Sequence, residues 1–183
     1  MTSSFKEEQK KMDEFLIGTS KRDRNHSQLK NLPDDVIRMI YFHFSVCLDN
    51  SVLIEKGMLK LLEFKHSQKL LHMMDNSLIE EAAYFGQDCI IRWLLRSGFV
   101  YSRHAFDFAA QQGHMSTLYY FASVALKGTL NALNWAAEKG NLDVVQFLVR
   151  YQPEHCNLVM ARRISFRVGQ DAIFSFLNSL HIQ

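Results

Sequence analysis

Residues 131–150, NALNWAAEKGNLDVVQFLVR, contain two helical patterns separated by a single glycine. Gly140 supplies the turn between the two patterns, because glycine has no side chain to restrict its backbone. Before the turn, Ala136 and Ala137 place small side chains where one helix must approach a neighbour closely. After the turn, apolar residues recur at helical spacing, at Val144, Val145, Leu148 and Val149. The stretch therefore predicts a helical hairpin.

The same arrangement recurs upstream at a fixed interval. The matching segments are 77–98, 104–122 and 131–149, and each has a pair of alanines followed three positions later by a glycine. These glycines are Gly86, Gly113 and Gly140, each 27 residues after the one before. A fixed period of this kind is typical of a solenoid, in which each unit buries its apolar face against the next.

A weaker copy of the pattern follows at 164–180, ISFRVGQDAIFSFLNSL. Gly169 stands 29 residues after Gly140, and Ser165 and Phe166 replace the alanine pair. Terminal units of solenoids are often atypical, because one of their faces lacks a neighbour. The sequence thus predicts an all-α protein whose C-terminal part, 76–183, is a solenoid of about four helical hairpins. The expected units are 77–103, 104–130, 131–156 and 157–183.

The string AAEKGNLDVVQFLV at 136–149 closely resembles the ankyrin repeat, whose usual pattern is T-P-L-H-x-A-A-x-x-G-H before an aliphatic second helix. The proline is missing here, and the period is about six residues short of the usual ~33. The shortfall lies between Gly98 and His104, where such repeats usually carry a β-hairpin finger. The resemblance implies ankyrin-like hairpins joined by short loops in a protein-binding scaffold. Short repeats of this kind, sometimes behind an F-box-like start, are known from amoebae, oomycetes and their large viruses.

The N-terminal part has a different character. Residues 1–30 are polar with mixed charges and predict a lead or linker, whereas 31–75 contain amphipathic helical patterns. The stretch LPDDVIRMI at 32–40 resembles the start of an F-box, a small helical domain that docks on the Skp-type adaptor of cullin-RING ubiquitin ligases. The resemblance implies that four residues contact that adaptor: Leu32, Pro33, Ile37 and Ile40. The rest of the segment lacks the second-helix cluster of that family, so the alternative is a helical cap on the solenoid.

Patterns that carry common chemistries are missing from the sequence. The chain has no phosphate-cradling glycine loop with Lys-Ser or Lys-Thr, no H-E-x-x-H, no G-x-S-x-G and no C-x-x-C pair. We therefore expect no enzymatic activity, no metal and no cofactor. The net charge of +2, from 21 basic and 19 acidic residues, gives no electrostatic reason to expect nucleic acid or a membrane surface as a partner.

Other sequence features indicate the compartment. The start of the chain lacks the apolar run of a secretory signal, and no stretch approaches the ~18 apolar residues of a membrane span. Three widely spaced cysteines, Cys47, Cys89 and Cys156, do not form a disulfide framework and are expected to be buried reduced thiols. We expect an intracellular protein, in the cytoplasm, with the nucleus as the alternative.

The resemblance also suggests where a protein partner binds. In an ankyrin-type first helix, residues just before and just after the alanine pair point to the concave face of the array. The 27-residue step aligns them in two rows, the first Glu81, Phe108 and Trp135 and the second Tyr84, Gln111 and Glu138. Large aromatic residues are common anchors of protein interfaces, so we expect these six residues to bind a protein partner. The alternative is that Phe108 and Trp135 pack between helices as core residues. Second-helix residues such as Tyr119 are expected to face solvent or to pack between repeats.

Overall fold

The computed structural model describes residues 48–71 and 75–180, and within these ranges the chain is helical and has no strand. The α-helices follow one another in pairs. The pairs are α4 (Asn50–Glu55) and α5 (Leu59–Ser67), α6 (Ser77–Tyr84) and α7 (Asp88–Arg96), α8 (Arg103–Gln112) and α9 (Met115–Ser123), α10 (Asn131–Lys139) and α11 (Leu142–Tyr151), and α12 (Leu158–Val168) and α13 (Asp171–Ser179). A short 3-10 helix, η1 (Pro153–His155), lies between α11 and α12. The predicted all-α solenoid is confirmed.

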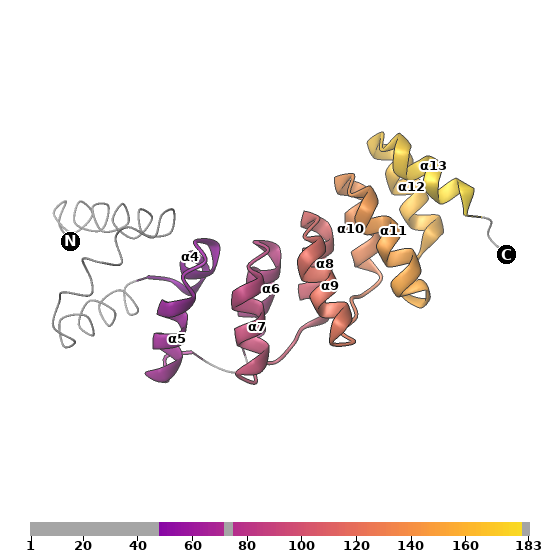
Figure 1. The fold of residues 1–183 in the computed structure, drawn as a ribbon. Helices are drawn as coiled ribbons and strands as arrows, with labels where there is room; N and C mark the ends of the chain where they lie inside the picture. The colour runs from indigo at the N-terminus through magenta and orange to yellow at the C-terminus, as the bar shows by residue number, and fades with distance from the viewer. Residues whose placement is uncertain (1–47, 72–74, 181–183) are drawn as a thin grey trace, which may run out of the picture.

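The pairs stack in chain order, so the array has a layer of first helices and a layer of second helices (Figure 1). The first helices α6, α8, α10 and α12 contact one another extensively, whereas the second helices α9, α11 and α13 touch at only a few points. A stack that is packed more closely on one side curves toward that side. The first-helix layer is therefore the inner side of the array, and the second-helix layer is the outer side.

Small residues explain the close approach of the first helices. The paired alanines of α6, α8 and α10 are all fully buried: Ala82, Ala83, Ala109, Ala110, Ala136 and Ala137. Larger side chains, among them Phe106, Phe121, Ile91 and Leu148, are buried in the same continuous core. Alanine in one layer and bulky residues elsewhere thus determine both the packing and the direction of curvature.

A glycine with a left-handed backbone ends the first helix of each pair. The five residues are Gly57, Gly86, Gly113, Gly140 and Gly169, and their φ angles lie between 67° and 85°. In three pairs, the polar side chain that follows the glycine of one pair reaches back to a backbone carbonyl of the pair before. Gln87 donates to the Glu55 carbonyl (3.1 Å), Asn141 donates to the Gln111 carbonyl (2.8 Å), and His114 Nε2 lies 2.9 Å from the Tyr84 carbonyl. These contacts satisfy carbonyls at helix ends and link each pair to the next.

The pair α4–α5 lies inside the segment 31–75, for which the sequence suggests an F-box-like domain or a cap. Helix α4 packs against α6, and Gly57 precedes Gly86 by 29 residues with the same left-handed backbone. Residues 50–67 therefore continue the stack as a further repeat-like pair. Leu53 and Ile54 occupy the alanine positions and are buried, which is why the alanine pattern does not reveal this pair.

Several predictions concern residues that the structure does not describe. The lead at 1–30 and the F-box-like stretch 32–40 lie outside the described ranges, and so does Cys47. The four residues assigned to adaptor binding are in that stretch: Leu32, Pro33, Ile37 and Ile40.

The cysteine prediction is wrong for Cys89, which is exposed on α7 because it faces away from the core stripe of that helix. Cys156 is partly buried, and burial raises the pKa of its thiol to about 11. Both thiols are free of disulfides. Cys156 is therefore a weak nucleophile at neutral pH, since the thiolate is the reactive form.

Candidate functional site

The inner layer carries three neighbouring aromatic side chains, Tyr84 from α6, Phe108 from α8 and Trp135 from α10. The ring of Phe108 stacks on that of Trp135 with centroids 5.6 Å apart and an interplanar angle of 22°. The ring of Tyr84 meets Phe108 edge to face at 6.2 Å. Tyr84 is 42% exposed, and the other two rings are partly exposed. We call these three residues the inner aromatic row, a continuous apolar strip across three helix pairs.

The six predicted partner-binding residues occupy different environments. Phe108 and Trp135 lie together as the first row requires, but Tyr84, which the sequence places in the second row, contacts Phe108 of the first. Glu138 is exposed beyond the row on α10. Gln111 is partly exposed, and its backbone carbonyl accepts a hydrogen bond from Asn141. The aromatic residues thus form the centre of the surface and polar residues form its edge.

Glu81, the remaining predicted residue, lies on α6 in a partly buried position. Its Oε2 atom is buried and has no hydrogen-bond partner among the described residues. Burial raises the pKa of Glu81, a hydrogen bond from Ser51 lowers it in part, and the nearby carboxylates of Asp49, Asp75 and Glu80 raise it further. The site therefore disfavours the charged form of this side chain.

A buried polar cluster fixes the short loop between α9 and α10. Asp107 of α8 is fully buried, and its carboxylate accepts hydrogen bonds from the backbone N–H (2.8 Å) and the hydroxyl (2.6 Å) of Thr129. His104 lies 3.3 Å from the same carboxylate. Gly128 donates its N–H to the buried side chain of Gln152 (3.1 Å). The cluster ties α8 to the start of α10 and so helps to hold Phe108 and Trp135 in register.

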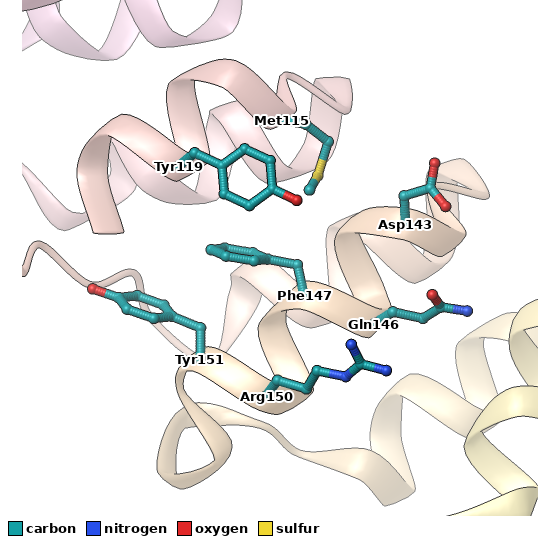
Figure 2. A pocket seen from close by; sticks show the side chains of 7 residues that line it. All are labelled: Met115, Tyr119, Asp143, Gln146, Phe147, Arg150 and Tyr151. Atoms are coloured by element: carbon teal, nitrogen blue, oxygen red, sulfur yellow. The ribbon is translucent and has the colours of Figure 1, made fainter. Parts of the chain in front are cut away.

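A second candidate surface lies between α9 and α11 in the outer layer (Figure 2). It is a groove of about 560 Å³ that we call the outer groove, lined by Met115, Tyr119, Asp143, Gln146, Phe147, Arg150 and Tyr151. Figure 2 shows Met115 and Tyr119 on α9 opposite Phe147 on α11. Tyr119 meets Phe147 edge to face at 5.3 Å, and Phe147 stacks on Tyr151 at 5.4 Å. An aromatic floor therefore runs between the two helices.

Sequence reasoning missed the outer groove. Tyr119 follows Gly113 by six residues, whereas Phe147 follows Gly140 by seven, so a comparison of equivalent repeat positions does not pair them. The signal that was present is the concentration of aromatic residues on two successive second helices. The groove itself depends on the wider separation of the outer helices, which follows from packing in the inner layer.

Features of two other functional classes are absent from residues 48–71 and 75–180. No three histidine, cysteine, aspartate or glutamate side chains gather there as metal ligands would. None of the helices in these ranges is long and apolar enough to span a membrane.

The hairpin geometry has a counterpart among known families. The family model described as Ankyrin repeat matches residues 130–161, which include all of α10 and α11 and the start of α12. The match supports an ankyrin-repeat protein. Ankyrin repeats generally mediate protein–protein interaction and are typically non-catalytic. No curated protein matches the chain.

Proposed function

We propose that this ankyrin-repeat protein is a non-catalytic scaffold that binds a protein partner on the inner aromatic row. The observation that supports the proposal is the stack of Phe108 on Trp135, with Tyr84 beside it, partly exposed across three helix pairs. Aromatic side chains on rigid helices provide large contact areas with little loss of conformational entropy on binding. A partner that covers the row would bury all three rings at once.

The edge of the row indicates the chemistry of the partner. Glu138 carries an exposed carboxylate, Glu81 carries a carboxyl group whose site favours the neutral form, and Gln111 can donate and accept hydrogen bonds. Complementary charge at the rim of an interface favours encounter and excludes wrong partners. We therefore propose a partner segment with an apolar centre and basic or hydrogen-bond-donating side chains around it.

A random peptide library displayed on phage and selected on the Tyr119→Ala variant of the full chain tests this proposal, because that variant removes an exposed aromatic side chain from the outer groove and leaves the inner layer unchanged. Independent binders should lose about 30-fold or more in affinity for Trp135→Ala, because truncation of a central anchor typically costs at least ~2 kcal/mol. Their affinity for the unmodified protein should equal their affinity for Tyr119→Ala, which changes only the outer layer. Binders that bind Trp135→Ala as tightly as the unmodified protein would contradict the proposal.

Two controls distinguish a lost contact with the partner from unfolding caused by the tryptophan substitution. Circular dichroism should show that Trp135→Ala retains its helix content and a cooperative thermal transition. Glu138→Lys changes an exposed rim residue without touching the aromatic stack, so it should weaken binding of basic peptides while leaving stability unchanged. If Trp135→Ala unfolds the protein and Glu138→Lys leaves binding intact, the ring belongs to the core and the proposal fails.

The alternative function is an F-box-type adaptor that links the bound partner to a cullin-RING ubiquitin ligase. It rests on the sequence resemblance at 32–40. A purified Skp-type adaptor should then bind the full chain, and the double substitution Leu32→Ala with Pro33→Ala should abolish that binding. No binding by a folded sample at micromolar concentrations would remove this alternative and leave the scaffold proposal in place.

A further inference from the structure

Two charged side chains in the outer groove have no partner within the described parts of the chain. Asp143 lies in the first turn of α11 and Arg150 in its last turn, and both are exposed. Neither forms an ion pair or a hydrogen bond with another described residue, in contrast to Lys127 and Glu154, which pair with each other nearby. The groove thus presents an unpaired acid and an unpaired base.

Gln146 lies between these two charges on α11, and an apolar floor lies beside them on the side that faces α9 (Figure 2). The rings of Phe147 and Tyr151 are stacked, and Tyr119, which is 59% exposed, closes the groove from α9. Exposed aromatic surface beside opposite charges is complementary to a segment in which an apolar residue is flanked by a base and an acid.

The dimensions of the groove limit the size of that segment. Asp143 and Arg150 are seven residues apart on one helix, which corresponds to ~10.5 Å along its axis. Alternate residues of an extended peptide face the same side, so a base and an acid that both point into the groove stand two or four positions apart, ~7 or ~13 Å at ~3.3 Å per residue. The four-residue spacing leaves one inward-facing residue between them. The volume of about 560 Å³ also lies in the range of clefts that hold compact ligands, roughly 300–1,000 Å³. The groove therefore suits a few extended residues rather than a folded domain.

We propose that the outer groove binds a short extended segment of a protein partner. Its basic side chain meets Asp143, an apolar residue two positions along covers Tyr119 and Phe147, and an acidic residue four positions from the base meets Arg150. The groove and the inner aromatic row lie in opposite layers, so the chain holds two partners at once. A negative result for one binding surface therefore leaves the proposal for the other surface in place.

Two labelled peptides test the groove by fluorescence anisotropy: Gly-Lys-Ser-Leu-Ser-Glu-Gly and its reversed sequence. Both are needed because the groove sets the order of the charges and leaves the direction of the peptide chain open. One of them should bind the full chain saturably. Tyr119→Ala should weaken this binding about 30-fold, as expected for loss of an aromatic anchor. No saturable binding of either peptide to the folded protein would overturn the proposal.

A charge reversal with a matched control tests the position of the peptide. Arg150→Glu should weaken binding about tenfold, and a peptide with lysine in place of its glutamate should recover most of the loss. Arg96→Glu makes the same change at the equivalent exposed position of α7, ten residues after Gly86, and should leave binding within about twofold. Equal effects of the two reversals would show long-range attraction only and would overturn the proposal.

The inner-row variant separates this inference from the proposed function. Trp135→Ala should leave binding of the lysine–glutamate peptide unchanged, since Trp135 lies in the other layer. Loss of binding in Trp135→Ala, with Tyr119→Ala unaffected, would place the peptide on the inner aromatic row. That result would overturn the groove proposal while supporting the inner row as a binding surface.

Discussion

Glu81 is a residue whose folded environment favours its neutral form. Burial raises the pKa of this carboxyl above its ordinary value of 4.5, so the ionised group destabilises the folded state when the pH lies above the raised pKa. The destabilisation begins to decrease as the pH falls through that pKa, because the folded protein then takes up a proton, and it is absent below the ordinary value of 4.5. Glu81→Gln should accordingly raise the melting temperature at pH 7 and change it little at pH 4.

The control for this prediction is Glu138→Gln, which removes the same charge from an exposed position. It should leave the melting temperature unchanged at both pH values. Thermal unfolding followed by circular dichroism measures all three proteins. A gain for Glu81→Gln that is equal at pH 4 and pH 7 would show that burial of the charge is not the cause.

Asp107 is the acceptor on which the loop between α9 and α10 depends. Asp107→Ala would leave the N–H and hydroxyl of Thr129 without their partner, and hydrogen bonds to a charged group contribute ~1.5–3 kcal/mol each. We expect the free energy of unfolding in urea to fall by about 3 kcal/mol. His104→Ala removes only the exposed side of the cluster and should cost less than about 1 kcal/mol. Similar losses in the two variants would argue against a central role for the carboxylate.

At the scale of the helices, the glycine turns also determine how closely the pairs stack. Gly86 and Gly169 both have a left-handed backbone, so alanine at either position introduces similar strain, ~1–2 kcal/mol. At Gly86 the added Cβ would also lie only 2.7 Å from the ring of His114, whereas nothing lies within 4 Å at Gly169. Gly86→Ala should therefore reduce the free energy of unfolding by about 1 kcal/mol more than Gly169→Ala. Equal losses would mean that the ring moves aside without cost.

Most helix pairs could be predicted from the sequence because their geometry requires particular residues. Close packing of first helices requires residues such as Ala136 and Ala137, and the turn requires glycine, so these positions repeat with a visible period. Amphipathic helices were expected in 31–75, but the repeat-like pairing of α4 and α5 was missed because Leu53 and Ile54 fill the alanine positions. Only Gly57 remained as a signal.

The candidate surfaces were predictable to different extents. Phe108 and Trp135 occupy the same position of successive repeats, so their proximity follows from the period alone. Tyr84 and Phe108 contact each other although they occupy different positions within their repeats. The same is true of Tyr119 and Phe147 in the outer groove. Such contacts depend on the distance and rotation between helices, which the period does not specify.

At the scale of the whole molecule, stability should vary along the stack. Helices α8 and α10 each lie between two other first helices, whereas α12 has a first helix, α10, on one side only within the described part of the chain. Phe166 of α12 is 72% exposed at a position equivalent to the buried second alanine of the preceding pairs. Native-state hydrogen exchange should therefore be slowest in α8 and α10 and fastest in α12 and α13. Uniform protection would instead indicate a single cooperative unit.

The emission of Trp135 tests the inner aromatic row most directly. The chain has two tryptophans, so Trp93→Phe leaves Trp135 as the only reporter. Because the ring is partly exposed, a partner that covers the row must remove it from water. Saturation with a peptide selected on the Tyr119→Ala variant should shift the emission to shorter wavelength and reduce quenching by acrylamide. Saturating binding with unchanged Trp135 emission and quenching would contradict binding at the inner aromatic row.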